Sequence, residues 1–179
     1  MSTRVDVTQA TILESVLAEL RTSLTLNESQ CFEVADPAEI PPLPPGGDYF
    51  LTVAWGASDY SEDEQVPASL IGATVNSLGH VLEFSTLEVT IHTRTKLDRA
   101  GHDRYLLLEE KRGLLRLKPK VIGALVGKDL TDLEGNTFLR DEIAIRRSRP
   151  PEVWVQRSNS TVVGRLSLTF SCHFDLAIK

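Results

Sequence analysis

Cysteine and histidine are residues that often do chemistry, and here they stand side by side at Cys172 and His173. A thiol and an imidazole can act as nucleophile and base when their side chains meet. The surrounding run "SLTFSCHFDL", however, alternates apolar and polar residues without a break, which is the period of a β-strand with one buried face. Because neighbours on a strand point to opposite sides of the sheet, Cys172 should face the core and His173 should face away from it. We therefore predict that this pair forms no catalytic site.

The histidines offer few other routes to catalysis. The chain has four: His80, His92, His102 and His173. None has a recognised metal-ligand spacing to another histidine or cysteine. His102 and Glu109, seven residues apart, would share a helical face, so a small metal-dependent hydrolase using His102 with Glu109 or Glu110 stays open as an alternative.

Two further patterns associated with catalysis are incomplete. The run "GALVGKDL" resembles a phosphate-binding loop, but Gly123 and Gly127 are one residue too close and the segment should end a helix rather than begin one. No nucleophile elbow of the G-x-S-x-G type occurs. We therefore predict a protein that is not an enzyme, with no catalytic residue, no metal and no cofactor.

The composition indicates one domain and no membrane partner. The chain of 179 residues can bury a substantial core, and it contains no run of about 20 apolar residues. Its first residues, "MSTRVDVTQA", lack the apolar core of a signal peptide, which predicts synthesis in a cytoplasm. Cys31 and Cys172 lie far apart in apolar surroundings, which favours reduced core thiols, although a pairing between them stays open.

Charge is distributed unevenly along the chain. Residues 1–85 hold 2 basic and 13 acidic side chains (net −11), whereas residues 86–179 hold 17 basic and 12 acidic ones (net +5), which gives −6 overall. Either the halves neutralise each other within one fold, or copies attract each other head to tail. The arginines near Trp154 could contact nucleic acid, but a pI near 5.2 disfavours a dedicated nucleic-acid binder.

The first half should form a helix followed by strands. The run "DVTQATILESVLAELRTSL" predicts an amphipathic helix with Asp6 as its N-cap. A short apolar run, "CFEV", and a stiff proline-rich connector, "DPAEIPPLPPGGD" at 36–48, precede the strand "DYFLTVAWG". A long polar excursion at about 56–80 then leads to "LEVTIHTRT", which alternates like a half-buried strand.

The second half should form helices and then strands. A helical pattern runs from Asp98 to Leu117, and Pro119 fits the first turn of a second helix that stops at Gly127. Three strands follow: "FLRDEIAIRR", "EVWVQ" and residues 162–176. The order predicts a single α+β domain over residues 1–179, a mainly antiparallel sheet packed against an N-terminal helix and one or two central helices. The last strand should bury Leu166, Leu168, Phe170 and Phe174 against the N-terminal helix.

This order of elements carries a family resemblance. An opening helix ("ATILESVLAELRTSL") is followed by a proline-marked loop and strand ("PPLPPGGDYFLTVAWG"), the polar strand "LEVTIHTRTK" and the central helices. A strand with "IAIRRSRP" and the closing strand "GRLSLTFSCHFDL" complete the order. Over most of residues 7–177 the chain resembles the tail terminator family of tailed bacteriophages.

The resemblance implies a structural virion protein made in the bacterial host cytoplasm. It would form a homo-hexameric ring at the head-proximal end of the tail tube, end tube polymerisation and join the tail to the head. Its partners would be its own copies, the tail tube protein and a head-side connector or neck protein, with DNA only passing through the ring lumen. Its location would be the head–tail junction of the virion. Another neck or completion protein, or a monomeric cytosolic adaptor, is the alternative.

A ring of identical copies needs two complementary patches on each copy, and the charge pattern suggests both. The basic candidates are the arginines of "IRRSRPP": Arg146, Arg147 and Arg149. The acidic candidates are Asp59, Glu62, Asp63 and Glu64. Arginine can grip a carboxylate at two points, so we predict that these two groups meet across an interface. A solvated basic stretch with no partner is the alternative.

Overall fold

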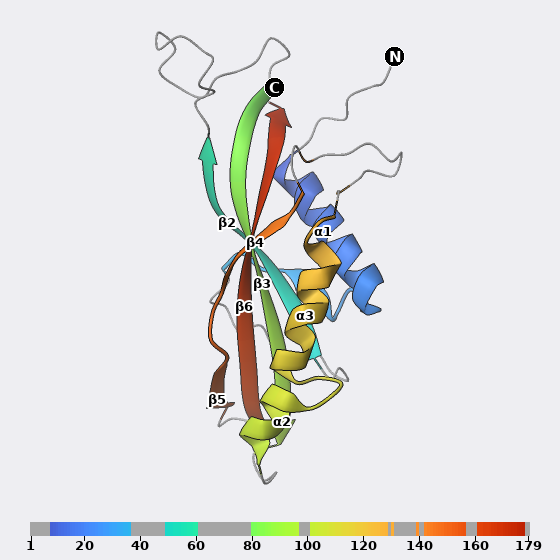
Figure 1. Ribbon diagram of the computed structural model, residues 1–179, viewed down its shortest axis with the longest axis vertical. Helices are drawn as coiled ribbons and strands as arrows, with labels where there is room; N and C mark the ends of the chain where they lie inside the picture. The colour runs from blue at the N-terminus through green and yellow to red at the C-terminus, as the bar shows by residue number, and fades with distance from the viewer. Residues whose placement is uncertain are drawn as a thin grey trace.

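Two long antiparallel strands run the length of the molecule, and the helices lie on one side of them (Figure 1). The computed structural model describes residues 8–36, 49–60, 80–96, 101–128, 130, 139, 142–156 and 161–177. Its elements in chain order are α1 (Gln9–Leu24), β1 (Cys31–Glu33), β2 (Tyr49–Tyr60), β3 (His80–Lys96), α2 (His102–Leu108), α3 (Leu114–Leu125), β4 (Ala144–Ser148), β5 (Glu152–Gln156) and β6 (Thr161–Ala177). The predicted α+β class is confirmed.

The strands form one sheet in the order β1-β2-β3-β6-β4, and β5 also pairs with β6. β3 and β6 pair over 17 residues each, a ladder of about 55 Å at roughly 3.3 Å per residue. β4 pairs with residues 168–171 of β6 and β5 with residues 161–165, so these two strands follow each other along one edge. β1 lies at the opposite edge and is parallel to β2, while every other pairing is antiparallel.

Strict alternation along β3 and β6 gives the sheet a helix-covered face and an opposite face. Leu87, Val89 and Ile91 of β3 stand opposite Phe170, Leu168 and Leu166 of β6. All six side chains are at most 1% exposed and belong to the core, which the four apolar residues Ile12, Val16, Leu17 and Leu20 of α1 join. The face assignment made from the alternation of β6 is therefore confirmed.

One detail of the predicted packing is wrong. α2 and α3 pack against β3 and β6, whereas α1 packs mainly against β1, β2 and α3. Phe170 and Phe174 are fully buried as predicted, but the helices nearest their strand are the central ones. The sequence pattern shows which face of α1 is apolar, but it does not show which strands that face covers.

The N-cap of α1 lies two residues later than predicted. Thr8, not Asp6, is the N-cap, and its Oγ1 accepts a hydrogen bond of 3.2 Å from the backbone N–H of Thr11. At the other end Thr25 adopts a left-handed conformation with a φ of 56°. The N–H of Leu26 then donates to the carbonyl of Arg21 at 2.9 Å, which closes the last turn.

The break between the central helices also falls earlier than predicted. α2 ends at Leu108, and Pro119 is the sixth residue of α3 rather than part of its first turn. Gly113 sets the break, because a Cβ there would lie 2.6 Å from the backbone N and O of Glu109. Gly127, with a φ of 73°, follows the end of α3 as predicted.

The strands around the polar excursion are longer than predicted. β2 continues to Tyr60 and β3 begins at His80, so both ends of the predicted excursion at about 56–80 are strand. The remainder of it, and all of the proline-rich connector after Asp36, lie outside the described residues. In the C-terminal part, β4 covers only the end of "FLRDEIAIRR", and Leu139 forms an isolated bridge with Phe174.

Replacement of Phe170 by alanine should test the core. Phe170 is fully buried between the helices and β3, so Phe170→Ala should lower the free energy of unfolding by about 3–5 kcal/mol in denaturant melts. Val155→Ala is the matched control, because Val155 is 45% exposed on β5 and should change stability by less than about 0.5 kcal/mol. Equal small losses in the two variants would contradict the packing described above.

Candidate functional site

The three candidate arginines lie on β4 and just beyond it, at one edge of the sheet. Arg146, Arg147 and Arg149 are all exposed, and β4 pairs only with β6 among the described strands. The register shifts between Ile145 and Arg147, so Arg146 is the extra residue of a β-bulge. The bulge allows neighbouring arginines to reach toward the same side of the sheet.

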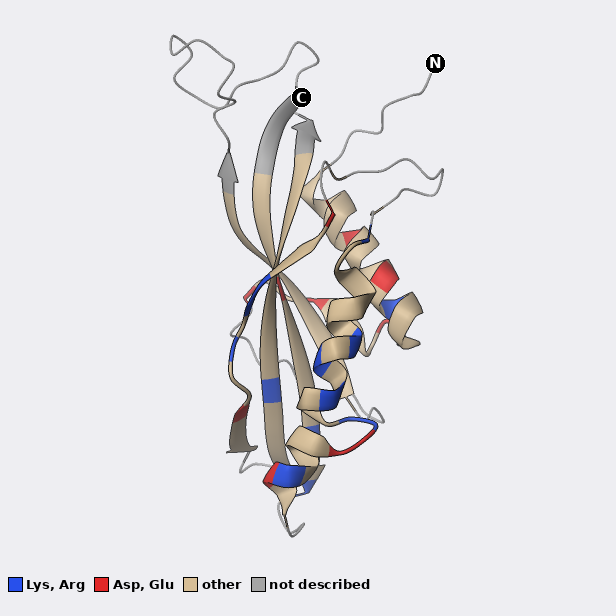
Figure 2. Ribbon diagram, viewed as in Figure 1, with Lys and Arg blue, Asp and Glu red and all other residues tan. Residues whose placement is uncertain are grey.

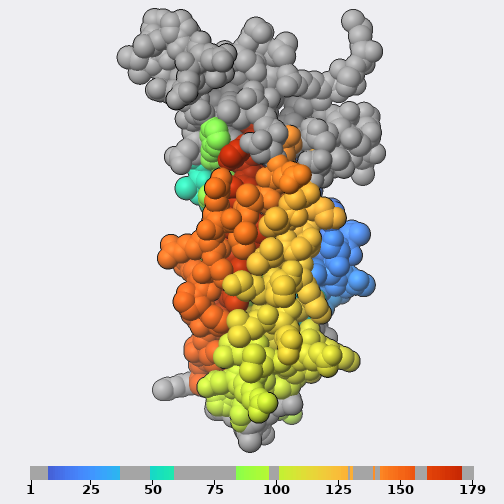
Figure 3. Space-filling model, in the orientation of Figure 1, coloured from blue at the N-terminus to red at the C-terminus, as the bar shows by residue number. Residues whose placement is uncertain are grey.

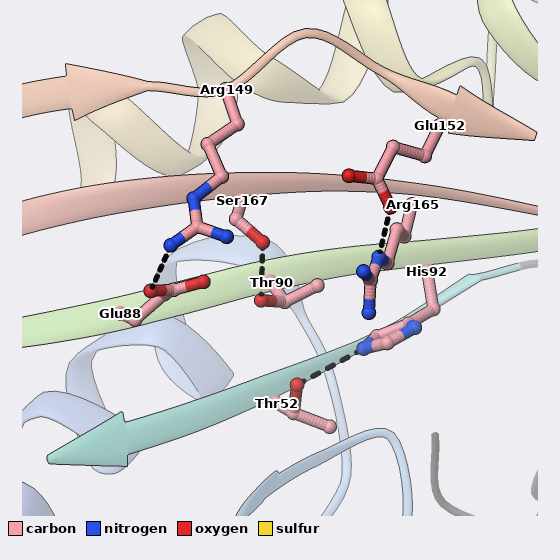
Figure 4. Close-up of polar contacts among 8 residues, drawn as sticks. All are labelled: Thr52, Glu88, Thr90, His92, Arg149, Glu152, Arg165 and Ser167. Atoms are coloured by element: carbon pink, nitrogen blue, oxygen red, sulfur yellow. Dashed lines mark hydrogen bonds and ion pairs between the residues drawn. The ribbon is translucent and has the colours of Figure 1, made fainter. Parts of the chain in front are cut away.

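Two of these arginines also have partners within the chain. Nε of Arg146 donates to Oγ of Ser171 at 2.8 Å. Arg149 reaches across β6, and its Nη2 lies 3.7 Å from Oε2 of Glu88 on β3 (Figure 4). Arg147 stands opposite Thr169 and has no side-chain partner among the described residues. Arg147 is therefore the one of the three that is most available to another molecule.

The sheet order does not bring the arginines next to Asp59 within one copy. Asp59 belongs to β2, and both β3 and β6 lie between β2 and β4. At about 4.8 Å per strand the two elements are roughly 14 Å apart. The side chain of Asp59, and residues Glu62, Asp63 and Glu64, lie outside the described part of the structure. A contact between Asp59 and these arginines would have to join two copies.

The face of the sheet away from the helices, the polar face, carries rows of polar side chains across the strands. One row joins Thr52, Thr90 and Ser167, and the hydroxyls of Thr90 and Ser167 are 2.9 Å apart. A second row joins Ala54, Glu88 and Thr169. Thr52 and Thr90 are 1% exposed and Ser167 is 7% exposed, so small hydroxyls lie buried beneath longer charged side chains (Figure 4).

His92 is the most deeply buried group of the polar face. The alternation predicted a polar strand face, yet His92 is 0% exposed and its ring stacks on Phe50 at 4.4 Å. Nε2 lies 3.0 Å from Oγ1 of Thr52, and Nδ1 has no hydrogen-bond partner. Burial, and secondarily the charge of Arg165, lower the pKa of His92 from 6.5 to about 4. His92 is therefore neutral at pH 7.

Arg165 connects this row to the sheet edge. Its Nε donates to Oε2 of Glu152 on β5 at 2.7 Å, and its guanidinium carbon lies 5.5 Å from the centre of the Trp154 ring. Sequence reasoning did not single out Glu88, Arg165 or Glu152. The alternation in "LEVTIHTRT" did place Glu88 and His92 on one face, but the partner strand that pairs their charges is distant in sequence.

The residues of the alternative metal site do not meet as one helical face. α2 ends at Leu108, so Glu109 has already left the helix that begins with His102. The Oε2 atom of Glu109 accepts hydrogen bonds from the backbone N–H groups of Lys111 (2.9 Å) and Arg112 (2.8 Å). Glu109 therefore shapes the turn between the central helices. Within the described residues, no three His, Cys, Asp or Glu side chains are grouped to hold a metal ion.

The two cysteines are buried and unpaired with each other. Cys31 lies on β1 and Cys172 on β6, with β2 and β3 between them. Burial raises the pKa of the Cys31 thiol from 9.0 to about 11. Cys172 faces the core and His173 lies on the opposite face against Phe84, with ring centroids 4.3 Å apart, as the alternation predicted.

Opposite charges lie at opposite edges of the sheet. Figure 2 shows basic residues along β4 and on α3, and acidic residues on α1. Glu33 at the end of β1 and Glu28 just before that strand are both exposed. Since β1 and β4 are the two ends of the strand order, the acidic and the basic edge face away from each other.

No helix in the described part of the chain has the length and apolar character to span a membrane.

The geometry defines an α+β protein with helices on one face of a sheet and paired polar side chains on the other. No protein-family model and no curated protein matches the chain. A chain in the virion of a native gene transfer agent particle is similar, with a TM-score of 0.49 and 17% identity over 92% of this chain and 94% of that one.

A second solved structure is the sheath/tube terminator of an extracellular contractile injection system in its extended state. Its TM-score is 0.42 and its identity 14%, over 98% of this chain and 58% of that chain. This chain thus spans less than two thirds of that protein.

The buried His92 should make stability depend on pH. The unfolded chain protonates its histidine near pH 6.5, whereas folded His92 resists protonation until about pH 4. The free energy of unfolding should therefore fall as the pH drops from about 6.5 to 4, by up to about 3 kcal/mol from this group, with no further loss below. Denaturant melts across this range measure the effect.

The comparison should use His92→Gln, which removes the titrating group and keeps a polar side chain. Between about pH 6.5 and 4, the free energy of unfolding of His92→Gln should fall less than that of the wild type. His102→Gln, at a position one third exposed, should show the same fall as the wild type. Identical pH profiles for the wild type and His92→Gln would contradict the assignment.

Proposed function

We propose that this chain is a structural protein of a tailed phage or phage-like particle. Copies of it form a closed ring, six in the class it resembles, at the head-proximal end of the tail tube. The ring ends tube polymerisation and joins the tail to a head-side connector or neck protein, while DNA passes through the lumen. Its place is the head–tail junction of the virion.

The observation that carries the proposal is the placement of opposite charges at opposite edges of one sheet. A ring of identical copies needs a head-to-tail contact in which two different patches meet. The β4 edge supplies arginines, and the β1 edge supplies Glu28 and Glu33. Because these patches lie at opposite ends of the strand order, each copy can contact one neighbour with each edge.

The tertiary structure adds support through the roles it gives to candidate reactive groups. His92 is buried and neutral, Glu109 holds a turn, and Arg165 is paired with Glu152. Each of these groups is engaged in contacts within the chain, which is compatible with a structural role.

Three groups of acidic residues are candidates for the contact with the β4 arginines of a neighbouring copy. Glu28 and Glu33 lie at the opposite edge of the described sheet, which suits a head-to-tail contact. The group Asp59, Glu62, Asp63 and Glu64 remains the second candidate. Glu88 is the third, but it already contacts Arg149 within the same copy and is only 13% exposed.

Reversal of Arg147 should test the ring contact. Arg147 is exposed and has no partner within the described residues, so Arg147→Glu should leave the melting temperature within a few degrees of the wild type. It should abolish ring formation, measured by light scattering and by electron microscopy of purified tails. Lys96→Glu, the same charge change at an exposed position on β3, should leave assembly unchanged.

A second reversal identifies the partner. In a head-to-tail ring every interface of a doubly reversed chain carries both changes, so Arg147→Glu with Glu33→Arg should restore assembly. Restoration by reversal at Asp59, Glu62, Asp63 and Glu64 instead would assign the contact to that group. If Arg147→Glu particles have tails of normal length with heads attached, the proposed interface is wrong. If labelling places the protein away from the head–tail junction, the proposed function is wrong.

A further inference from the structure

The outer face of α3 is a surface that the ring contact does not use. It consists of the solvent-facing residues of this helix: Leu115, Arg116, Lys118, Pro119, Lys120 and Gly123. In the space-filling view α3 lies in the middle of the face toward the viewer, between α1 and the β4–β5 edge (Figure 3). The opposite side of the same helix is fully used, because Leu114, Leu117 and Val121 lie in the core.

Several residues of this face disfavour the helix that carries them. Arg116 and Lys120 are one turn apart, where like charges repel, and α3 contains no acidic residue to offset them. Pro119 removes a backbone hydrogen bond from the middle of the helix, and Gly123 lowers its stability relative to alanine. Leu115 is 43% exposed. Three features that disfavour the helix, and one exposed leucine, thus fall on one face.

Packing within the chain does not account for these choices. A Cβ built on Gly123 would meet nothing within 4 Å, so a larger residue would fit the isolated molecule. Arg116, Lys118 and Lys120 have no ion pair among the residues that the structure describes, whereas Lys128 contacts Glu19 at 3.5 Å. Residues that lower the stability of their helix and make no compensating contact within the chain indicate a functional surface.

The chemistry of the face selects a protein partner with carboxylates. Three cations require negative charge, and Leu115 with the bare backbone at Gly123 favours close apolar contact. A nucleic acid would use the cations only, and the net charge of −6 opposes its approach.

The helix layer of a second copy fits this face poorly. Residues 9–24 and 101–128 together hold eight Lys and Arg and five Asp and Glu, a net charge of +3. Two such layers facing each other would repel. The helix layer of a second copy is therefore disfavoured as the partner, and the acidic β1 edge of a second copy is already assigned to the β4 arginines.

We propose that the outer face of α3 binds an acidic surface of a different protein, with Arg116 and Lys120 contacting carboxylates and Gly123 allowing a close backbone approach. This inference goes beyond the ring and does not depend on it, since the face lies on the helix layer and not at a sheet edge.

Site-specific cross-linking in the cells that naturally make the chain tests this. A benzophenone amino acid at position 115 should give one main adduct with another protein, identified by mass spectrometry. The same probe at position 18, exposed on α1, sets the background. Arg116→Glu with Lys120→Glu should lower the adduct yield about tenfold. Lys96→Glu with Arg104→Glu, an equal charge change at exposed sites off α3, should not lower it.

Two further variants separate binding from folding. Gly123→Ala should raise the melting temperature of the purified chain and yet reduce the adduct. Reversal of the carboxylates beside the cross-linked site of the partner should restore the adduct with the doubly reversed α3. Several results would overturn the proposal: an adduct with another copy, an adduct with nucleic acid, a yield no higher than at position 18, or a yield that charge reversal leaves unchanged.

Discussion

The pairing of β3 with β6 is the constraint on which the rest of the structure depends. It is antiparallel and in register from His80↔Ala177 to Lys96↔Thr161, with no irregularity. A slip of one residue would turn every side chain to the other face, so Leu87, Val89 and Ile91 would leave the core and Glu88 and His92 would enter it. The apolar alternation on both strands makes that slip costly. β2 pairs with β3, β4 and β5 pair with β6, and α2 and α3 pack on both strands, while β1 and α1 are attached through β2 and α3.

The two faces of the β3–β6 pair have different roles. The helix-covered face is apolar and supplies the core. The polar face buries Thr52, Thr90 and His92, which is favourable only because hydrogen bonds and stacking compensate most of their lost hydration. Above them, Arg149 and Glu88 pair across β6. The charged groups at the centre of the polar face are thus paired within the chain, whereas the recognition surfaces that we propose are the two sheet edges and the outer face of α3.

The edges differ in charge because of where the chain enters and leaves the sheet. The acidic first half of the chain contributes α1 and the β1 edge, while the basic second half contributes α3 and the β4 edge. Charge that is segregated along the sequence is thus also segregated in space. In the ring that we propose, long-range attraction between unlike edges would favour head-to-tail approach of copies, and the exposed β4 arginines would provide the specific contacts.

The sequence by itself determined the elements, since periodicity follows from the local geometry of strand and helix. The alternation of residues 166–174 predicted which side chains of β6 are buried, and the apolar stripe of α1 predicted its buried face. Caps and breaks were less well predicted: Thr8 replaced Asp6, and Gly113 rather than Pro119 separates α2 from α3. Only the tertiary structure decided that His92 is buried and neutral, that Glu88 meets Arg149, and that two strands separate Asp59 from β4. These depend on contacts between residues distant in the chain, which no local pattern encodes.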